Sequence, residues 1–154
     1  MGAVLPVAAP LGGTVVELAQ VDDPVFSAAL VGPGIALDPG TVAESTAVAP
    51  VAGTIAKLHP HAFVVTTDDG VGILVHLGID TVQLQGAGFT LHAAEGDRVE
   101  AGQALVTWSP GDVVAGGRSA VCPVVALDQK PDAVSVVATT GATLEAGAEL
   151  FEVR

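Results

Sequence analysis

Two pairs of internal repeats constrain the fold of this chain more than any other feature. APLGGTVVEL (residues 9–18) recurs as APVAGTIAKL (49–58), and GDRVEAGQAL (96–105) recurs as GATLEAGAEL (141–150). Each repeat joins a glycine-containing turn to a short run of Val, Leu or Ile, which is typical of a β-strand and its turn. A unit that occurs only twice predicts a duplicated β motif, because a solenoid needs at least three repeats.

The remaining turn signals divide the chain into further short strands. They are VGPG (31–34), DPG (38–40), TDDG (67–70) and SPGD (109–112), and the chain holds 19 Gly and 10 Pro. No 12-residue segment has a good helical period, although residues 22–30 could form a short turn of helix after Asp22. We therefore expect one domain over residues 1–154, with its core at about 5–152, folded as an all-β antiparallel sandwich or flattened barrel.

The charge of the chain limits the kinds of partner that it can bind. Seventeen acidic residues face only five basic ones, so the net charge is −12. Such a surface repels phosphate backbones and anionic lipid headgroups, which argues against nucleic acid and membrane surfaces as partners. A partner with a basic contact face is favoured, and the alternative is that the charge serves solubility alone.

Compartment and membrane insertion can be argued from the cysteine count and the hydropathy. Cys122 is the only cysteine, which excludes an internal disulfide, fits a reducing cytosol and is expected to be a small buried hydrophobe. No apolar run reaches the roughly 20 residues that a membrane span requires. The N-terminal MGAVLPVAAP lacks a basic region and is broken by two prolines, so we do not expect a signal peptide.

Two histidines are placed to face each other across a predicted hairpin. HAFVVTT (61–67) and VGILVHL (71–77) flank Asp-Asp-Gly, a strong hairpin signal. With a four-residue loop over 67–70, His61 lies directly opposite His76 on one face, and a slip of one residue would place them on opposite faces. A lone histidine in an aliphatic strand is usually structural.

A facing pair of imidazoles supports chemistry in two ways. The two rings can divide the roles of nucleophile and proton donor, or they can bind zinc if a third ligand is present. We expect the other two histidines, His59 and His92, to be solvated surface residues.

Several of these segments together resemble one known family. HPHAF, followed 15 residues after its second histidine by the histidine of VHLGIDTVQL, then GAGF and EGDRVEAGQ, is similar to the glucose-family enzyme IIA of the bacterial phosphoenolpyruvate:sugar phosphotransferase system. The similarity runs from APLGGTV near the start, through CPVV, to the last strand. It implies an antiparallel β-sandwich that relays a phosphoryl group by covalent attachment to histidine.

The resemblance also implies roles for single residues. His76 would be the phosphorylated histidine, attacking through Nε2, and His61 would donate to the phosphoryl oxygens. The backbone carbonyl of Gly78 would hold Nδ1–H of the active imidazole. The rim that meets partners would comprise acidic and apolar side chains: Asp23, Asp80, Val25, Phe26, Leu74 and Val82. The chain departs from the family pattern before His61, where LHPHAF lacks the hydroxyl residue that orients the second imidazole.

The expected function is that of a phosphocarrier in sugar uptake. It would accept a phosphoryl group from the histidine phosphocarrier protein HPr and pass it to the IIB domain of a membrane sugar permease, which sets the sugar specificity. We expect a cytoplasmic monomer without direct membrane insertion. No cofactor is expected beyond the phosphohistidine itself, although His61 and His76 could hold adventitious zinc or zinc shared with a partner.

Two other functions compete with the phosphocarrier. One is a regulatory protein whose binding is gated by phosphorylation of the same face. The other is a zinc hydrolase that shares a β-sandwich core and an H-x-H motif, and for which the sequence offers no evident third ligand.

Overall fold

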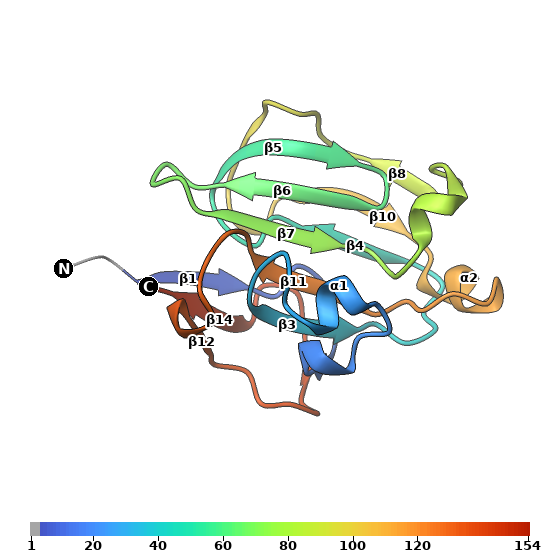
Figure 1. Cartoon of the computed structure of the whole chain (residues 1–154). Helices are drawn as coiled ribbons and strands as arrows, with labels where there is room; N and C mark the ends of the chain where they lie inside the picture. The colour runs from blue at the N-terminus through green and yellow to red at the C-terminus, as the bar shows by residue number, and fades with distance from the viewer. Residues whose placement is uncertain (1–3) are drawn as a thin grey trace.

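Antiparallel strands make up almost all of the regular structure in the computed structural model, which describes residues 4–154 (Figure 1). This confirms the predicted all-β fold class. The strands are β1 Leu5–Ala8, β2 Gly13–Val16, β3 Gly34–Asp38, β4 Ser45–Val48, β5 Gly53–His59, β6 Ala62–Thr66, β7 Gly72–His76, β8 Phe89–Leu91, β9 Arg98–Val99, β10 Ala104–Trp108, β11 Cys122–Ala126, β12 Val134–Val136, β13 Thr143–Leu144 and β14 Glu149–Val153. The short helices are α1 Pro24–Ser27 and α2 Pro110–Ala115, with the 3-10 turns η1 Leu18–Gln20, η2 Thr81–Leu84 and η3 Pro131–Ala133.

The strands form three sheets. The largest has eight strands in the order β13-β2-β3-β11-β7-β6-β5-β9, and two three-stranded sheets have the orders β1-β14-β12 and β4-β10-β8. In Figure 1, β5, β6 and β7 lie one above another in the upper half of the molecule, while β3 and β11 continue the same sheet below. The first and last strands are paired, so the two ends of the described chain lie side by side.

The sequence repeats correspond to a structural duplication. β2 and β5 belong to the two copies of the first repeat, and β13 and β9 to the two copies of the second. β2 pairs with β13, and β5 pairs with β9. Where the two units meet, Ala8 N donates to Pro50 O (3.0 Å) and Val48 N donates to Pro10 O (2.7 Å). Ala8 and Val48 directly precede the two copies of the first repeat, and Pro10 and Pro50 are the second residues of those copies, so each unit donates to the other in the same way. The predicted duplicated β motif is confirmed.

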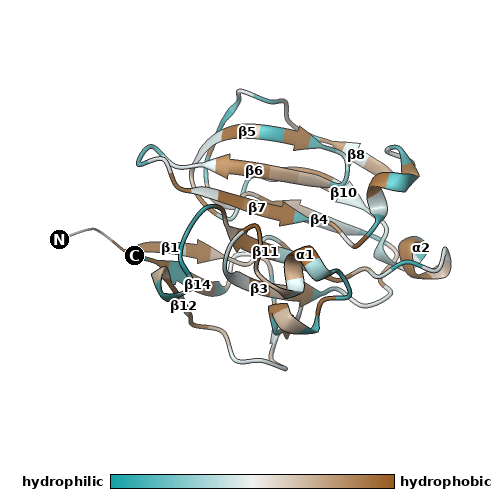
Figure 2. Ribbon diagram, in the orientation of Figure 1, coloured by the Kyte–Doolittle hydropathy of each residue, from teal (hydrophilic) through white to brown (hydrophobic). Residues whose placement is uncertain are grey.

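Side-chain alternation along the strands builds two apolar clusters. In β7, Ile73 and Val75 are buried in the main core while Leu74 and His76 lie on the opposite face. Figure 2 shows apolar residues along most of the strands. A smaller cluster lies between α1 and the sheet, where Phe26 packs with Leu18 of η1, Ala36 of β3 and Val125 of β11. Val21 and Ile79 complete the cluster. This cluster supports the face on which His76 lies.

Both α-helices begin with a side-chain cap. The helix expected after Asp22 is present, but Asp23 caps it, accepting a hydrogen bond from Val25 N at 2.9 Å. The prediction of a plain turn at SPGD was wrong, because Ser109 accepts from Asp112 N (3.2 Å) with Pro110 in the first turn and begins α2. Neither of these helices, nor any other within residues 4–154, is long and apolar enough to cross a membrane.

Candidate functional site

The β6–β7 hairpin exists, but its register differs from the predicted one. Ala62, not His61, is opposite His76, and Thr66 is opposite Gly72. Thr67 N donates to Val71 O at 2.9 Å, which leaves a three-residue loop of Asp68, Asp69 and Gly70. Gly70 has a φ of 88°, the left-handed conformation that the third residue of such loops requires. The predicted four-residue loop was wrong by one residue because this glycine closes the tighter turn.

The two imidazoles nevertheless meet. His61 lies in the turn between β5 and β6, outside the regular alternation of either strand. Its carbonyl accepts a hydrogen bond from Leu77 N at 2.7 Å, which fixes its backbone beside the end of β7. The ring centroids of His61 and His76 are 5.3 Å apart, with an interplanar angle of 66°. The predicted pair is confirmed, although the turn and not the strand register brings it together.

One hydrogen bond determines the tautomer of His76. Its Nδ1–H donates to the carbonyl oxygen of Gly78 at 2.5 Å, so Nε2 keeps its lone pair when the ring is neutral. Gly78 has a φ of 79°, and a Cβ there would lie 2.7 Å from Thr81 Cγ2 and 2.9 Å from Ser119 O. Only glycine fits this place without a shift of its neighbours, so the carbonyl is held where the resemblance implies.

The surroundings of His76 favour its neutral form. Burial lowers the pKa of His76, and the hydrogen bond to Gly78 and the charges of Asp23 and Asp80 oppose this only in part. The ring of Phe26 contacts His76 edge-on, with centroids 5.3 Å apart. His76 is thus a neutral imidazole in a largely apolar setting, with one nitrogen free to react.

His61 is less buried than His76, and a third imidazole stacks against it. Burial lowers the pKa of His61, and the neighbouring His76 and His59 lower it further. The ring of His59 stacks on His61 with centroids 5.7 Å apart and an interplanar angle of 20°. The prediction that His59 is a solvated loop residue was incomplete, because this exposed side chain packs on the site. The H-x-H spacing was the available signal, and it was considered only as a metal pair.

The structure brings most of the predicted rim to one place but buries one member. Val25 and Val82 are 42% and 56% exposed, and Asp80 is exposed beside them. Asp23 is half-buried and caps α1. Phe26 is only 7% exposed, so its placement in an exposed docking rim was wrong. The four-residue helix turns its ring inward onto the small apolar cluster.

A cavity that the sequence did not indicate lies next to the histidines. Its volume is about 270 Å³, and the half-buried Leu74 lines it together with His59, Val64 and Lys57. Lys57 is not among the residues that the sequence assigned to the site. This lysine lies on the outward face of β5, beside the site. It is one of only five Lys and Arg residues in the chain.

Cys122 and His92 are the remaining candidate side chains. Burial raises the pKa of the Cys122 thiol to about 12, and Sγ donates to Ala120 O, so this cysteine is the expected small buried side chain. His92 is exposed as expected and bonds Thr107 Oγ1 at 2.7 Å. Within residues 4–154, no three His, Cys, Asp or Glu side chains are close enough to hold a metal ion. The zinc-hydrolase alternative therefore lacks a ligand set in the described chain.

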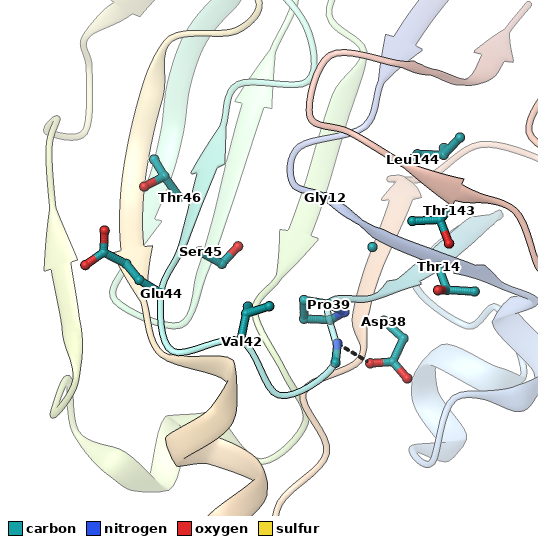
Figure 3. A pocket seen from close by; sticks show the side chains of 12 residues that line it. Gly12, Thr14, Asp38, Pro39, Val42, Glu44, Ser45, Thr46, Thr143 and Leu144 are labelled. Carbon is teal, nitrogen blue, oxygen red and sulfur yellow. Dashed lines mark hydrogen bonds between the residues drawn. The ribbon is translucent and has the colours of Figure 1, made fainter.

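A second cavity, of about 530 Å³, lies between the edges of β2, β3, β4 and β13 (Figure 3). Asp38 turns back to accept a hydrogen bond from Gly40 N at 2.8 Å and so shapes its wall. None of the histidines lines this cavity.

A family model, sequence relatives and a solved structure all relate this chain to the same group of proteins. Residues 5–131 match the family model described as phosphoenolpyruvate-dependent sugar phosphotransferase system, EIIA 1. The glucose-specific EIIA component of Halalkalibacterium halodurans is 43% identical over 119 residues, which cover 76% of this chain and 67% of that protein. The glucose permease IIA from Mycoplasma capricolum superposes with a TM-score of 0.87 at 30% identity, covering 99% of this chain and 97% of that one.

Some relatives are much longer than this chain. The glucose-specific EIICBA component of Streptococcus pneumoniae is 45% identical over 115 residues, which cover 73% of this chain but 15% of that protein. The mannose-specific EIIBCA component of Corynebacterium glutamicum is 40% identical over 126 residues, or 80% of this chain and 18% of that protein. The chain therefore spans less than a fifth of the length of these relatives.

Proposed function

The chain belongs to the EIIA 1 family of the phosphoenolpyruvate-dependent sugar phosphotransferase system, and from this premise we propose that it is a phosphocarrier in sugar uptake. It takes a phosphoryl group from phospho-HPr onto Nε2 of His76 and passes it to the IIB component of a sugar permease. In the first step the N–P bond of the donor breaks as the Nε2–P bond forms. In the second, that bond breaks as a cysteine thiolate of IIB takes the group.

The hydrogen bond from His76 Nδ1–H to Gly78 O carries this proposal. It selects the tautomer in which Nε2 is the nucleophile, and it is fixed by a glycine that no other residue can replace without strain. The lowered pKa of His76 keeps the ring neutral and ready to attack near neutral pH. A histidine that served only packing would not require this arrangement.

His61 is placed to stabilise the group in transit. A phosphoryl group on Nε2 carries charge on its three outer oxygens, and phosphoryl transfer depends chiefly on positioning and charge stabilisation. The edge-to-face arrangement of His61 and His76 lets an N–H of His61 point toward those oxygens. The apolar contact with Phe26 on the other side limits access of water, which would hydrolyse the intermediate.

The charge of the chain and the components fused in its longer relatives indicate the partners. EIIBCA relatives carry the B and C components in the same chain as an EIIA segment like this one, which supports IIB as the acceptor. Asp23 and Asp80 are negatively charged and cannot stabilise the phosphoryl dianion. They are placed to attract basic residues around the histidine of HPr. This exchange takes place in the cytoplasm, where a lone thiol such as that of Cys122 stays reduced.

The test is replacement of the nucleophile. His76→Ala should abolish acceptance of phosphate from phospho-HPr while the β-sheet circular dichroism spectrum stays unchanged. His92→Ala is the matched control, because His92 is an exposed histidine outside the site, and it should accept phosphate normally. The phosphorylated residue is located by tandem mass spectrometry at mildly alkaline pH. Phosphate on any residue other than His76 would refute the proposal.

A further inference from the structure

Three imidazoles lie in a row from solvent to core. His59 is exposed, His61 is half-buried between the other two rings, and His76 is the innermost. His59 is the last residue of β5 and pairs with Ala62, so the β5–β6 ladder fixes its backbone on the far side of the Pro60-His61 turn. The backbone of His59 is therefore fixed by strand pairing, which holds its side chain next to His61.

Ring contacts position the His61 side chain. In the part of the chain that the structure describes, neither ring nitrogen of His61 forms a hydrogen bond with another residue. The ring of His76 contacts it edge-to-face, and the near-parallel ring of His59 stacks on it with an offset. A stack covers the faces of a ring and leaves its edge, where the N–H group is, open to a ligand.

We propose that His59 is a positioning residue, whose ring holds the His61 imidazole in the orientation that presents an N–H to a phosphoryl group on His76. An aromatic stack thus does here what a hydrogen bond from a neighbouring hydroxyl would do. The inference rests on the proposed function, since it assigns His61 a ligand on Nε2 of His76. It adds a residue that acts through His61 and does not itself touch the transferred group.

Two substitutions distinguish the effect of the flat His59 ring from the effect of its hydrogen-bonding nitrogens. His59→Ala removes the stack, and His59→Phe keeps a flat ring of similar size without any hydrogen-bonding group. The first readout is the NMR spectrum of the unphosphorylated protein. In His59→Ala the nuclear Overhauser contacts between the His61 and His76 rings should weaken, since the His61 side chain turns more freely, and in His59→Phe they should persist. His92→Ala, which removes an imidazole elsewhere, should leave them unchanged.

The second readout is the rate of onward phosphoryl transfer to IIB. His59→Ala should lower kcat for onward transfer to IIB about threefold to tenfold, the range expected from loss of one aromatic pair, with KM unchanged. His59→Phe should restore the rate to within about twofold of wild type.

Three results would overturn the inference: wild-type spectra and rates in His59→Ala, a defect confined to KM, or failure of His59→Phe to restore both readouts. If wild-type protein itself accepts no phosphate, the proposed function fails. The NMR spectra of the unphosphorylated variants still decide whether His59 holds His61.

Discussion

At the scale of single residues, the proposed chemistry of this protein depends on which nitrogen of His76 is free. The Gly78 carbonyl binds Nδ1–H, and burial of the ring keeps the remaining nitrogen unprotonated. Gly78 lies two residues after His76, so the contact is made within one tight turn of chain. His61 and His59, by contrast, reach the site from a different turn.

The lowered pKa of His76 predicts the pH dependence of its phosphorylation. The folded pKa lies below the ordinary value of 6.5, so the ring loses its nucleophilic lone pair only when the pH falls below that value. The rate of acceptance from phospho-HPr should decrease at low pH, with the midpoint of the decrease below pH 6.5. Stopped-flow or quenched-flow rates at a series of pH values measure it, corrected for the titration of HPr. A decline centred above pH 6.5 would contradict the assignment.

Gly78 should be intolerant of a side chain. Gly78→Ala places a Cβ against Thr81 Cγ2 and Ser119 O, in addition to the cost of a positive φ, and should lower the free energy of unfolding by about 2–3 kcal/mol. It should also slow phosphorylation, because the carbonyl must rotate away from Nδ1. Urea unfolding and transfer rates measure the two effects.

Gly88→Ala is the control for that substitution. Gly88 has a similar φ of 86°, and a Cβ there would meet nothing within 4 Å. It should cost only the strain of the left-handed conformation, about 1 kcal/mol, and leave the transfer rate unchanged. Equal loss of stability in the two variants would show that the close contacts at Gly78 do not matter.

At the scale of elements, short pieces of regular structure position the site. The three-residue hairpin loop sets the register of β6 and β7, and α1, which is only four residues long, carries Phe26 onto His76. A helix of this length is not stable by itself, so its cap and its packing must hold it in place.

Asp23 should therefore have two separable effects. Asp23→Ala removes the cap of α1 and should destabilise the fold by about 0.5–2 kcal/mol, whereas Asp23→Asn keeps the capping oxygen and should cost much less. Both variants should lower the pKa of His76, because the charge of Asp23 raises it in the wild-type protein. Thermal unfolding and an NMR titration of His76 measure these effects. Equal destabilisation by Ala and Asn would exclude the capping role.

At the scale of the whole molecule, charge and exposed apolar residues combine around the histidines. The chain carries a net charge of −12, and Val25 and Val82 are exposed beside the carboxylates of the rim. The charge would favour rapid encounter with a basic partner, and burial of the two valines would stabilise the proposed complex.

Val82→Ser should weaken binding to HPr by about fivefold to tenfold, since part of a valine side chain is no longer buried against the partner. Asp80→Asn should mainly lower the association rate and its dependence on salt. Calorimetry and stopped-flow binding at two ionic strengths measure both. Val136→Ser, at a valine that is 46% exposed on β12, is the matched control and should bind as wild type does. If Val82→Ser also binds as wild type does, this residue is not in the docking surface.

Much of the fold could be predicted because it is local or repeated. The glycine turns and the duplicated APxxGT units are short-range features, and the structure shows them as paired strands that exchange equivalent hydrogen bonds. The start of α1 beside an aspartate and the bond between His76 and Gly78 also join residues that are close in the chain. Their geometry depends on a few backbone dihedrals, for which residue type is a sufficient guide.

The contacts that complete the site join residues distant in the chain, and the sequence did not determine them. Phe26 could equally have faced solvent, and it is buried because residues of β3 and β11 offer an apolar surface beneath α1. The hairpin register could have been either of two, and the tight loop at Gly70 selected one of them. His59 stacks on His61 because the β5–β6 turn brings the two residues side by side. Burial and ring stacking depend on how whole strands pack, and that packing is set by the sum of many weak contacts across the core.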